Sequence, residues 1–276
     1  MSVARRRRAG CGLFVCAALM AAAVWSGPAA AQGQELPPKE KFDLYLLIGQ
    51  SNMAGRGRMT ADDRRPREGI LMLNTENQWV PAAHPLHKDK PTAGVGLGIS
   101  FAENMAKQSP GVTIGLIPCA VGGTPLSRWS KGGDLYQAAV ARAKVAMEAG
   151  QLRGIIWHQG EADSSSEKNA NSYGERLAKM VADLREELGA KDAPFVAGEL
   201  GYFFMESPKR SPNSKVVNAH LKQIGQNVPN SACASAEGLD HKGDEVHFSS
   251  EALVEFGRRY AEAMRKLQTQ SEKASQ

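Results

Sequence analysis

The chain has 276 residues, of which 34 are Lys or Arg and 29 are Asp or Glu. Four of the basic residues, Arg5 to Arg8, lie in the first 31 positions, which hold no acidic residue, so the remainder has 30 basic and 29 acidic side chains. This balance gives no reason to expect a nucleic acid or an anionic membrane as partner. The remaining residues, about 245, are enough for one large α/β domain with a well-covered core.

The first 31 residues are predicted to be a signal peptide. Arg5 to Arg8 precede an apolar run from Cys11 to Trp25, and Ala29-Ala30-Ala31 offers small residues for cleavage before Gln32. A membrane anchor is the alternative, but the run is shorter than the ~20 apolar residues of a spanning helix. We therefore expect a secreted or periplasmic protein without stable membrane insertion after processing, and the sequence leaves the export route open.

After the signal, short apolar runs alternate with longer helical patterns, which is typical of a parallel sheet with helices on both faces. The predicted strands are residues 44–48, 70–73, 112–117, 154–157 and 195–198. The predicted helices are residues 100–108, 135–149, 173–188, 215–227 and 251–267. Residues 32–41 are expected to be a polar leader, 42–267 the folded domain and 268–276 a frayed polar tail, while the irregular stretches 75–98 and 199–214 are expected to shape a substrate cleft.

Three of the predicted strands run directly into small polar turns. These turns contain Ser51, Gly123 and Gln159, respectively. If the three strand ends are neighbours in one sheet, the hydroxyl of Ser51 meets amide donors from all three positions at the carboxyl edge, where open α/β sheets bind ligands. Taken alone, the serine turn is equally consistent with a helix cap, the glycine turn is explained as well by an ordinary tight turn, and His158, beside Gln159, is more often a buried histidine than a catalyst.

A fourth motif, Asp244-Glu245-Val246-His247, lies just before the last predicted helix. On a bent loop, the carboxylate of Asp244 can accept the Nδ1 proton of His247 and leave Nε2 free to take a proton from a serine. The alternative is an acidic approach to a helix N-terminus. Because a general base must be neutral, activity is expected to fall as the pH drops below about 6 to 6.5.

The ordered set of motifs resembles an SGNH hydrolase, and more narrowly the sialate O-acetylesterase-like domain of carbohydrate esterase family six. The matching segments are Gly49-Gln50-Ser51-Asn52 and residues 94–106, 116–129, 157–163 and 244–248. The resemblance implies a flavodoxin-like three-layer α/β/α sandwich, a triad of Ser51, His247 and Asp244, and an oxyanion hole of Ser51, Gly123 and Gln159. The broader superfamily has Asn where this chain has Gln159, a residue that the narrower family shares. Glu161 is a second candidate for the triad acid or a sugar contact, and Asp244 is favoured.

The resemblance implies a serine carbohydrate esterase that removes O-acetyl groups from sugars, of the acetylxylan esterase or sialate O-acetylesterase type, through an acetyl-enzyme intermediate. Gln50, Glu161 and Trp129 are candidate substrate contacts. A catalytically silent carbohydrate-binding protein and a lipase or thioesterase of the same superfamily are the alternatives.

No cofactor is expected. His84 and His87 have no carboxylate or cysteine at metal-ligand spacing, so no metal site is predicted either. Cys119 and Cys233, the cysteines that remain after processing, are either a disulfide or two free thiols. The sequence carries no sign of a particular oligomeric state.

Overall fold

Seven strands form one sheet in the order β3-β2-β4-β1-β5-β6-β7. They are β1 (Phe42–Gly49), β2 (Ile70–Leu73), β3 (Trp79–Pro81), β4 (Thr113–Pro118), β5 (Gln151–His158), β6 (Phe195–Gly198) and β7 (Ser231–Ala234). Adjacent strands are parallel except β2 and β3. The predicted α/β fold is confirmed. The two edge strands, β3 and β7, were not predicted.

The computed structural model describes residue 1 and residues 35–207 and 211–274, so the predicted signal peptide, Met1 apart, lies outside the described residues. The helices are α1 (Ser51–Ala54), α2 (Leu97–Gln108), α3 (Asp134–Ala149), α4 (Glu167–Asn171), α5 (Tyr173–Glu187), α6 (Tyr202–Met205), α7 (Ser214–Lys222), α8 (Ile224–Asn227) and α9 (Ser250–Ala274). Short 3₁₀ turns occur at η1 (Lys39–Lys41), η2 (Asp62–Arg64), η3 (Leu126–Trp129) and η4 (Asp163–Ser165). The single helix predicted for residues 215–227 is two helices, because the chain leaves helical geometry at Gln223.

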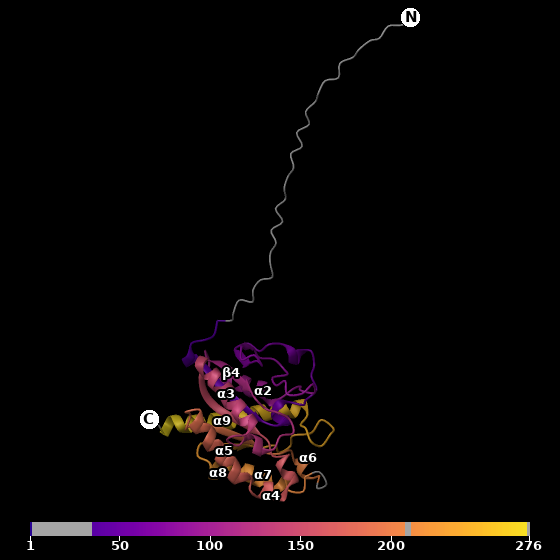
Figure 1. Ribbon diagram of the computed structural model, residues 1–276, viewed down its shortest axis with the longest axis vertical. Coiled ribbons are helices and arrows are strands. Elements are labelled where there is room, and N and C mark those ends of the chain that lie inside the picture. The colour runs from indigo at the N-terminus through magenta and orange to yellow at the C-terminus, as the bar shows by residue number, and fades with distance from the viewer. Residues whose placement is uncertain (2–34, 208–210, 275–276) are drawn as a thin grey trace. The chain divides into compact units, whose positions relative to one another are not determined.

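Alternating side chains of β1 enter two separate cores, as the two-residue period of a strand requires. Leu44 and Leu46 pack with residues of α3, α5, α7 and α8 on one face of the sheet. Tyr45 and Leu47 pack with residues of α2 and α9 on the other face. Helices therefore cover both faces, which gives the three-layer arrangement expected from the sequence (Figure 1).

The prediction of a frayed tail is wrong for residues 268–274, the part of the tail that the structure describes. Helix α9 continues to Ala274, seven residues beyond the predicted end at position 267. Gln268 is only 6% exposed, and its Nε2 donates to Tyr45 Oη at 3.2 Å and to the Arg153 carbonyl oxygen at 3.1 Å. The polar composition that suggested fraying thus includes a side chain that ties α9 to the sheet.

The carboxyl ends of β4, β1 and β5 lie side by side. Leu47 of β1 pairs with Pro118 of β4, and Gly49 of β1 pairs with His158 of β5. The residues that follow these three strands therefore reach the same edge of the sheet, which confirms the neighbouring strand ends on which the predicted site depends.

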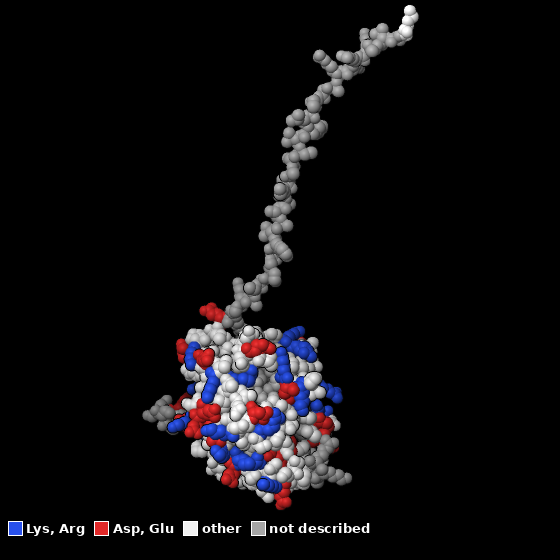
Figure 2. Space-filling model, viewed as in Figure 1, with Lys and Arg blue, Asp and Glu red and all other residues white. Residues whose placement is uncertain are grey.

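Cys119 and Cys233 are free thiols, which settles the alternative left open by the sequence. In residues 35–207 and 211–274, no helix is both long and apolar enough to cross a membrane. On the face shown in Figure 2, basic and acidic side chains are interspersed, in keeping with the balanced charge of the chain after its first 31 residues.

Candidate active site

The turn after β1 places Ser51 at the sheet edge. Gly49 has φ +130°, a conformation that side chains disfavour, and a Cβ there would overlap the carbonyl oxygen of His158. The next residue, Gln50, donates its N–H to the same carbonyl at 2.8 Å. The chain can therefore turn tightly against β5, and Ser51 begins α1 with only 6% of its surface exposed.

Ser51, His247 and Asp244 form a continuous hydrogen-bonded chain. Ser51 Oγ lies 3.0 Å from His247 Nε2, and His247 Nδ1 lies 2.7 Å from Asp244 Oδ2. Glu245 has φ +56° and bends the loop between acid and histidine, so that Asp244 faces back toward the ring. A serine hydroxyl, an imidazole and a carboxylate in this order are the groups that activate a serine nucleophile.

The environment of Asp244 keeps it ionised. Partial burial acts to raise its pKa, but hydrogen bonds from the His247 ring and from the backbone N–H groups of His247 and Val246 lower the pKa well below the usual aspartate value. Lys242 Nζ, 3.5 Å from Asp244 Oδ2, adds a positive charge nearby. An ionised Asp244 can orient His247 and stabilise the imidazolium that forms when the histidine takes a proton.

Gly123 lies in the turn after β4, close to the nucleophile. It has φ +77°, and no described residue accepts a hydrogen bond from its N–H or from that of Ser51. A Cβ on the preceding Gly122 would lie 3.4 Å from Ser51 Cβ. The two N–H groups that were predicted to bind the oxyanion are therefore available beside the serine.

Gln159 does not match its predicted role as an oxyanion donor. Its Nε2 donates to the Thr124 carbonyl at 3.1 Å and to Asp163 Oδ2 at 2.7 Å, so both amide hydrogens are in use. Its Oε1 accepts from Tyr173 Oη at 2.9 Å, which fixes the orientation of the amide. The fully buried side chain instead supports the turn that carries Gly123, because it holds the next residue, Thr124.

Asn52, which follows the nucleophile, joins three segments of the site. Its Nδ2 donates to Glu161 Oε1 at 2.6 Å and to the Val246 carbonyl at 3.2 Å, and its Oδ1 accepts from Phe248 N at 3.2 Å. The two residues that flank His247 are thus both bonded to one side chain. This role was not predicted, although Asn52 belongs to the motif that contains Ser51.

Glu161 accepts a hydrogen bond from Asn52 and has no hydrogen bond or ion pair with His247 among the described residues; its Oε1 is 3.5 Å from His158 Nε2. Burial acts to raise its pKa, but interactions with His158 and Asn52 lower the pKa below the usual glutamate value. Its Oε2 is shielded from solvent. Asp244 is therefore the acid bonded to the histidine, and a direct contact of Glu161 with substrate stays a prediction.

Trp129 was also predicted wrongly as a sugar contact. It is 1% exposed, packs edge-to-face on Trp157 and donates Nε1 to Thr124 Oγ1 at 3.1 Å. An indole in a core can satisfy its one donor in this way, and no ring face remains for a sugar. Gln50 is buried beside Ser51, where its Oε1 accepts from Ala162 N at 3.4 Å, and its contact with substrate stays a prediction.

Two further charged residues near Ser51 were missed. Arg56, after α1, and Asp89, in the loop between β3 and α2, form a buried ion pair of 2.6 Å. Asp89 belongs to a stretch predicted only as an irregular loop, and no local pattern distinguishes it from a surface charge. The pair contacts Gly122, next to the candidate oxyanion donor.

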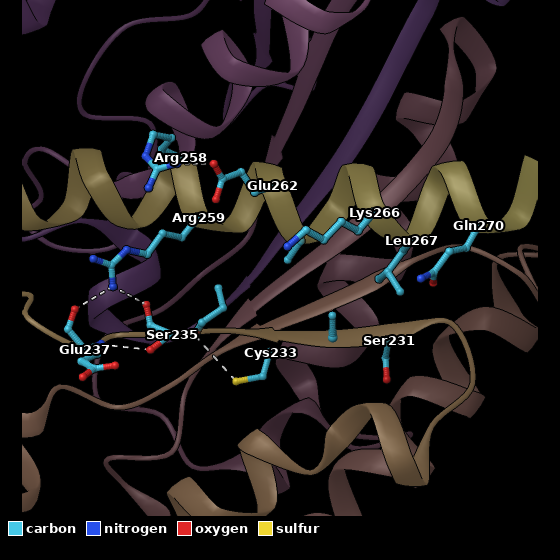
Figure 3. Close-up of a pocket in the computed structure, with 13 residues that line it drawn as sticks. Ser231, Cys233, Ser235, Glu237, Arg258, Arg259, Glu262, Lys266, Leu267 and Gln270 are labelled. Atoms are coloured by element: carbon cyan, nitrogen blue, oxygen red, sulfur yellow. Dashed lines mark hydrogen bonds and ion pairs between the residues drawn. The ribbon is translucent and has the colours of Figure 1, made fainter.

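A recess of about 770 Å³ lies between β7 and α9, away from the triad residues (Figure 3). In Figure 3, Arg259 of α9 reaches across the recess, where it donates to the carbonyl oxygens of Ser235 and Glu237. Arg258, on the same helix, is paired with Glu255 and Glu262. Arg258 and Arg259 are thus engaged by other groups of the fold, and Ser51, Asp244 and His247 do not line the recess.

Comparison with known proteins identifies the chain's relatives. A family model described as carbohydrate esterase, sialic acid-specific acetylesterase, matches residues 41–266. The probable carbohydrate esterase At4g34215 of Arabidopsis thaliana is 31% identical over 248 residues, which is 83% of this chain and 91% of the plant protein. The crystal structure of that plant protein superposes with a TM-score of 0.74 at 30% identity, over 83% of this chain and 99% of the solved one.

Two more distant solved structures share the fold. NanS superposes with a TM-score of 0.71 at 20% identity, over 85% of this chain and 100% of its own. XAC1771 of Xanthomonas citri, described as a carbohydrate acetylesterase, gives a TM-score of 0.64 at 21% identity, over 82% of this chain and 56% of its own. At these identities the likeness concerns the fold alone.

Proposed function

The chain belongs to the carbohydrate esterase family of sialic acid-specific acetylesterases and is a carboxylic ester hydrolase, and on this premise we propose that it removes O-acetyl groups from sugars with Ser51 as nucleophile. The observation that carries the proposal is the chain of contacts from Ser51 Oγ to His247 Nε2, at 3.0 Å, and from His247 Nδ1 to Asp244 Oδ2, at 2.7 Å. These distances allow proton transfer between hydroxyl and imidazole.

The proposed reaction has two halves. Ser51 Oγ attacks the carbonyl carbon of the acetyl ester while His247 Nε2 takes the serine proton, and the negative oxygen accepts hydrogen bonds from the N–H groups of Ser51 and Gly123. The bond between the carbonyl carbon and the sugar oxygen then breaks, and His247 returns the proton to that oxygen. Water repeats the attack on the acetyl-enzyme and releases acetate.

The substrate is tested by acetate release from acetylated xylan, O-acetyl sialic acid and simple acetylated sugars in parallel. The wild type should release acetate from at least one of them, and Ser51→Ala should abolish the release while the protein remains folded. The control is Ser109→Ala, which changes a hydroxyl at the end of α2 and should leave activity unchanged. Retention of most acetate release by Ser51→Ala would exclude this serine as the nucleophile.

Three further measurements test the acetyl-enzyme and the alternative functions. Rapid acid quenching during turnover of p-nitrophenyl acetate should yield a protein one acetyl group heavier, with the group on the peptide that contains Ser51. A preference for long acyl chains over acetyl would indicate a lipase or thioesterase, and sugar binding without any ester hydrolysis would indicate a silent binding protein.

We also propose that the protein is exported to the periplasm or beyond the cell. The support is the order of Arg5 to Arg8, the apolar run from Cys11 to Trp25 and the small residues Ala29-Ala30-Ala31. Expression with the native N-terminus should give a mature protein that begins at Gln32. A cytosolic product that retains residues 1–31 would contradict the proposed export, but it would not contradict the proposed esterase function.

A further inference from the structure

The turn that carries Gly123 is held on both sides by hydrogen bonds. Val121 N donates to the Gly49 carbonyl at 3.0 Å, Gly122 N donates to Asp89 Oδ2 at 2.8 Å, and Gln159 Nε2 donates to the Thr124 carbonyl at 3.1 Å. These contacts leave the N–H of Gly123 without an acceptor among the described residues. One neighbour of Gly123 is therefore fixed by Asp89 and the other by Gln159.

Asp89 is itself fixed by Arg56. Arg56 Nη2 donates to Asp89 Oδ2 at 2.6 Å, Nη1 lies 3.3 Å from Asp89 Oδ1, and the two side chains are 4% and 2% exposed. Burial acts to raise the pKa of Asp89, but hydrogen bonds from Arg56 and Gly122 lower the pKa below the usual aspartate value. The carboxylate is therefore ionised, and a two-point guanidinium contact sets its orientation.

This ion pair lies against the nucleophile. Arg56 comes two residues after the end of α1, whose first residue is Ser51, and its Nη1 also donates to the Gly55 carbonyl at 2.7 Å. A Cβ on Gly122 would overlap Arg56 Nη2, would lie 3.1 Å from Asp89 Oδ2 and would lie 3.4 Å from Ser51 Cβ. The guanidinium and the carboxylate thus connect the serine turn after β1 with the glycine turn after β4.

The peptide unit between Gly122 and Gly123 is planar, so a shift of Gly122 changes the direction of the Gly123 N–H. Both residues are glycines, and Gly123 has φ +77°, so the turn has little side-chain packing of its own to hold it. We propose that Asp89, oriented by Arg56, is a positioning residue that fixes the Gly122–Gly123 peptide, so that the N–H of Gly123 is aimed at the oxyanion formed at Ser51. This inference rests on the proposed esterase function.

The test compares an oxygen ester with its sulfur counterpart. A thiono ester replaces the carbonyl oxygen with sulfur, which is larger and accepts hydrogen bonds more weakly, so an intact oxyanion hole favours the oxygen ester. The ratio of kcat for p-nitrophenyl acetate to kcat for its thiono analogue therefore reports on the oxyanion donors. General damage to the fold lowers both rates and leaves the ratio unchanged.

Asp89→Asn keeps the size of the side chain but removes its charge. We expect kcat for the oxygen ester to fall by about 10- to 100-fold, less than the loss of ~10²–10³ for a deleted oxyanion donor, because the Gly123 N–H is displaced and not removed. The oxygen-to-sulfur ratio should fall as well, while KM changes little. Asp183→Asn is the matched control, since it removes a carboxylate paired with Lys179 on α5, and it should leave both rates and the ratio unchanged.

Arg56→Lys gives a second variant, which keeps the positive charge but loses the two-point contact with Asp89. If Asp89→Asn does not fold, Arg56→Lys tests the proposal in its place. Its oxygen-to-sulfur ratio of kcat should also fall below the wild-type ratio. An unchanged ratio in a folded variant, even with lower rates, overturns the positioning role. A wild type that hydrolyses no ester overturns the proposed function instead, so the two failures are distinguishable.

Discussion

The side-chain amide of Asn52 donates to Glu161 Oε1 at 2.6 Å, and the same side chain bonds the backbone on both sides of the candidate base, His247. Asn52 follows Ser51 directly in the chain. One side chain therefore sets the nucleophile turn, the loop of the histidine and the turn after β5 relative to one another.

Asn52→Ala is expected to lower kcat on the order of 100-fold, because even a small displacement of His247 spoils the geometry for proton transfer. It should also lower the free energy of unfolding by about 2–4 kcal/mol, because Glu161 Oε1 and Phe248 N lose a buried partner. Steady-state kinetics and chemical denaturation measure the two effects. Asn104→Ala, which removes an amide on α2 that bonds only its own helix at Ser100, serves as control. Full activity in folded Asn52→Ala would refute this role.

Gly49→Ala should be among the most damaging single changes near the site. The new Cβ would overlap the His158 carbonyl, and the residue would have to adopt φ +130°. Overpacking and backbone strain together should reduce the free energy of unfolding by about 2–5 kcal/mol. Gly111→Ala separates the two causes, because Gly111 has φ +79° but nothing lies within 4 Å of its added Cβ. Its loss should be limited to roughly 1 kcal/mol of strain; equal losses in both variants would refute the steric argument.

The central strands could be predicted because their apolar runs are continuous, whereas the edge strands could not. Burial on both faces requires a run such as that of β1. By contrast, β3 has three residues, of which the last is a proline, and β7 is Ser-Ala-Cys-Ala, so neither carries such a run. Their pairing depends on the neighbouring strands β2 and β6, which supply contacts that no local pattern contains.

The same distinction holds in the site. Ser51 and Gly123 could be placed from sequence because each lies in a turn that follows a recognisable strand, and the ends of adjacent parallel strands meet. Asp89 could not be placed, because a buried ion pair and a surface charge look alike in a sequence. Gln159 was found in the right position but with the wrong role, because only the structure shows that Thr124 and Asp163 use both of its amide hydrogens.

Asp244 should stabilise the folded protein at neutral pH, and this stabilisation should be lost as the pH falls. Its pKa in the folded state lies below the usual aspartate value of 3.8, so the stabilisation is present above that value and is lost as the pH falls through the lower folded value. The difference in free energy of unfolding between wild type and Asp244→Asn should therefore shrink as the pH falls below about 4. Denaturation at several pH values measures it, with Asp240→Asn, an exposed residue of the same loop, as control. A difference that widens toward acid would contradict the assignment.

Trp129 should contribute to stability and not to substrate affinity. Trp129→Phe removes the Nε1 bond to Thr124 Oγ1 and leaves a small void beside Trp157, so the free energy of unfolding should fall by about 1–3 kcal/mol. Thr124 Oγ1 still donates to the Val121 carbonyl at 2.8 Å, which should keep the glycine turn in place. KM for acetylated sugars and for p-nitrophenyl acetate should then stay close to the wild-type values. If the indole stacked on a sugar, KM would rise for the sugar ester alone, and that result would restore Trp129 as a substrate contact.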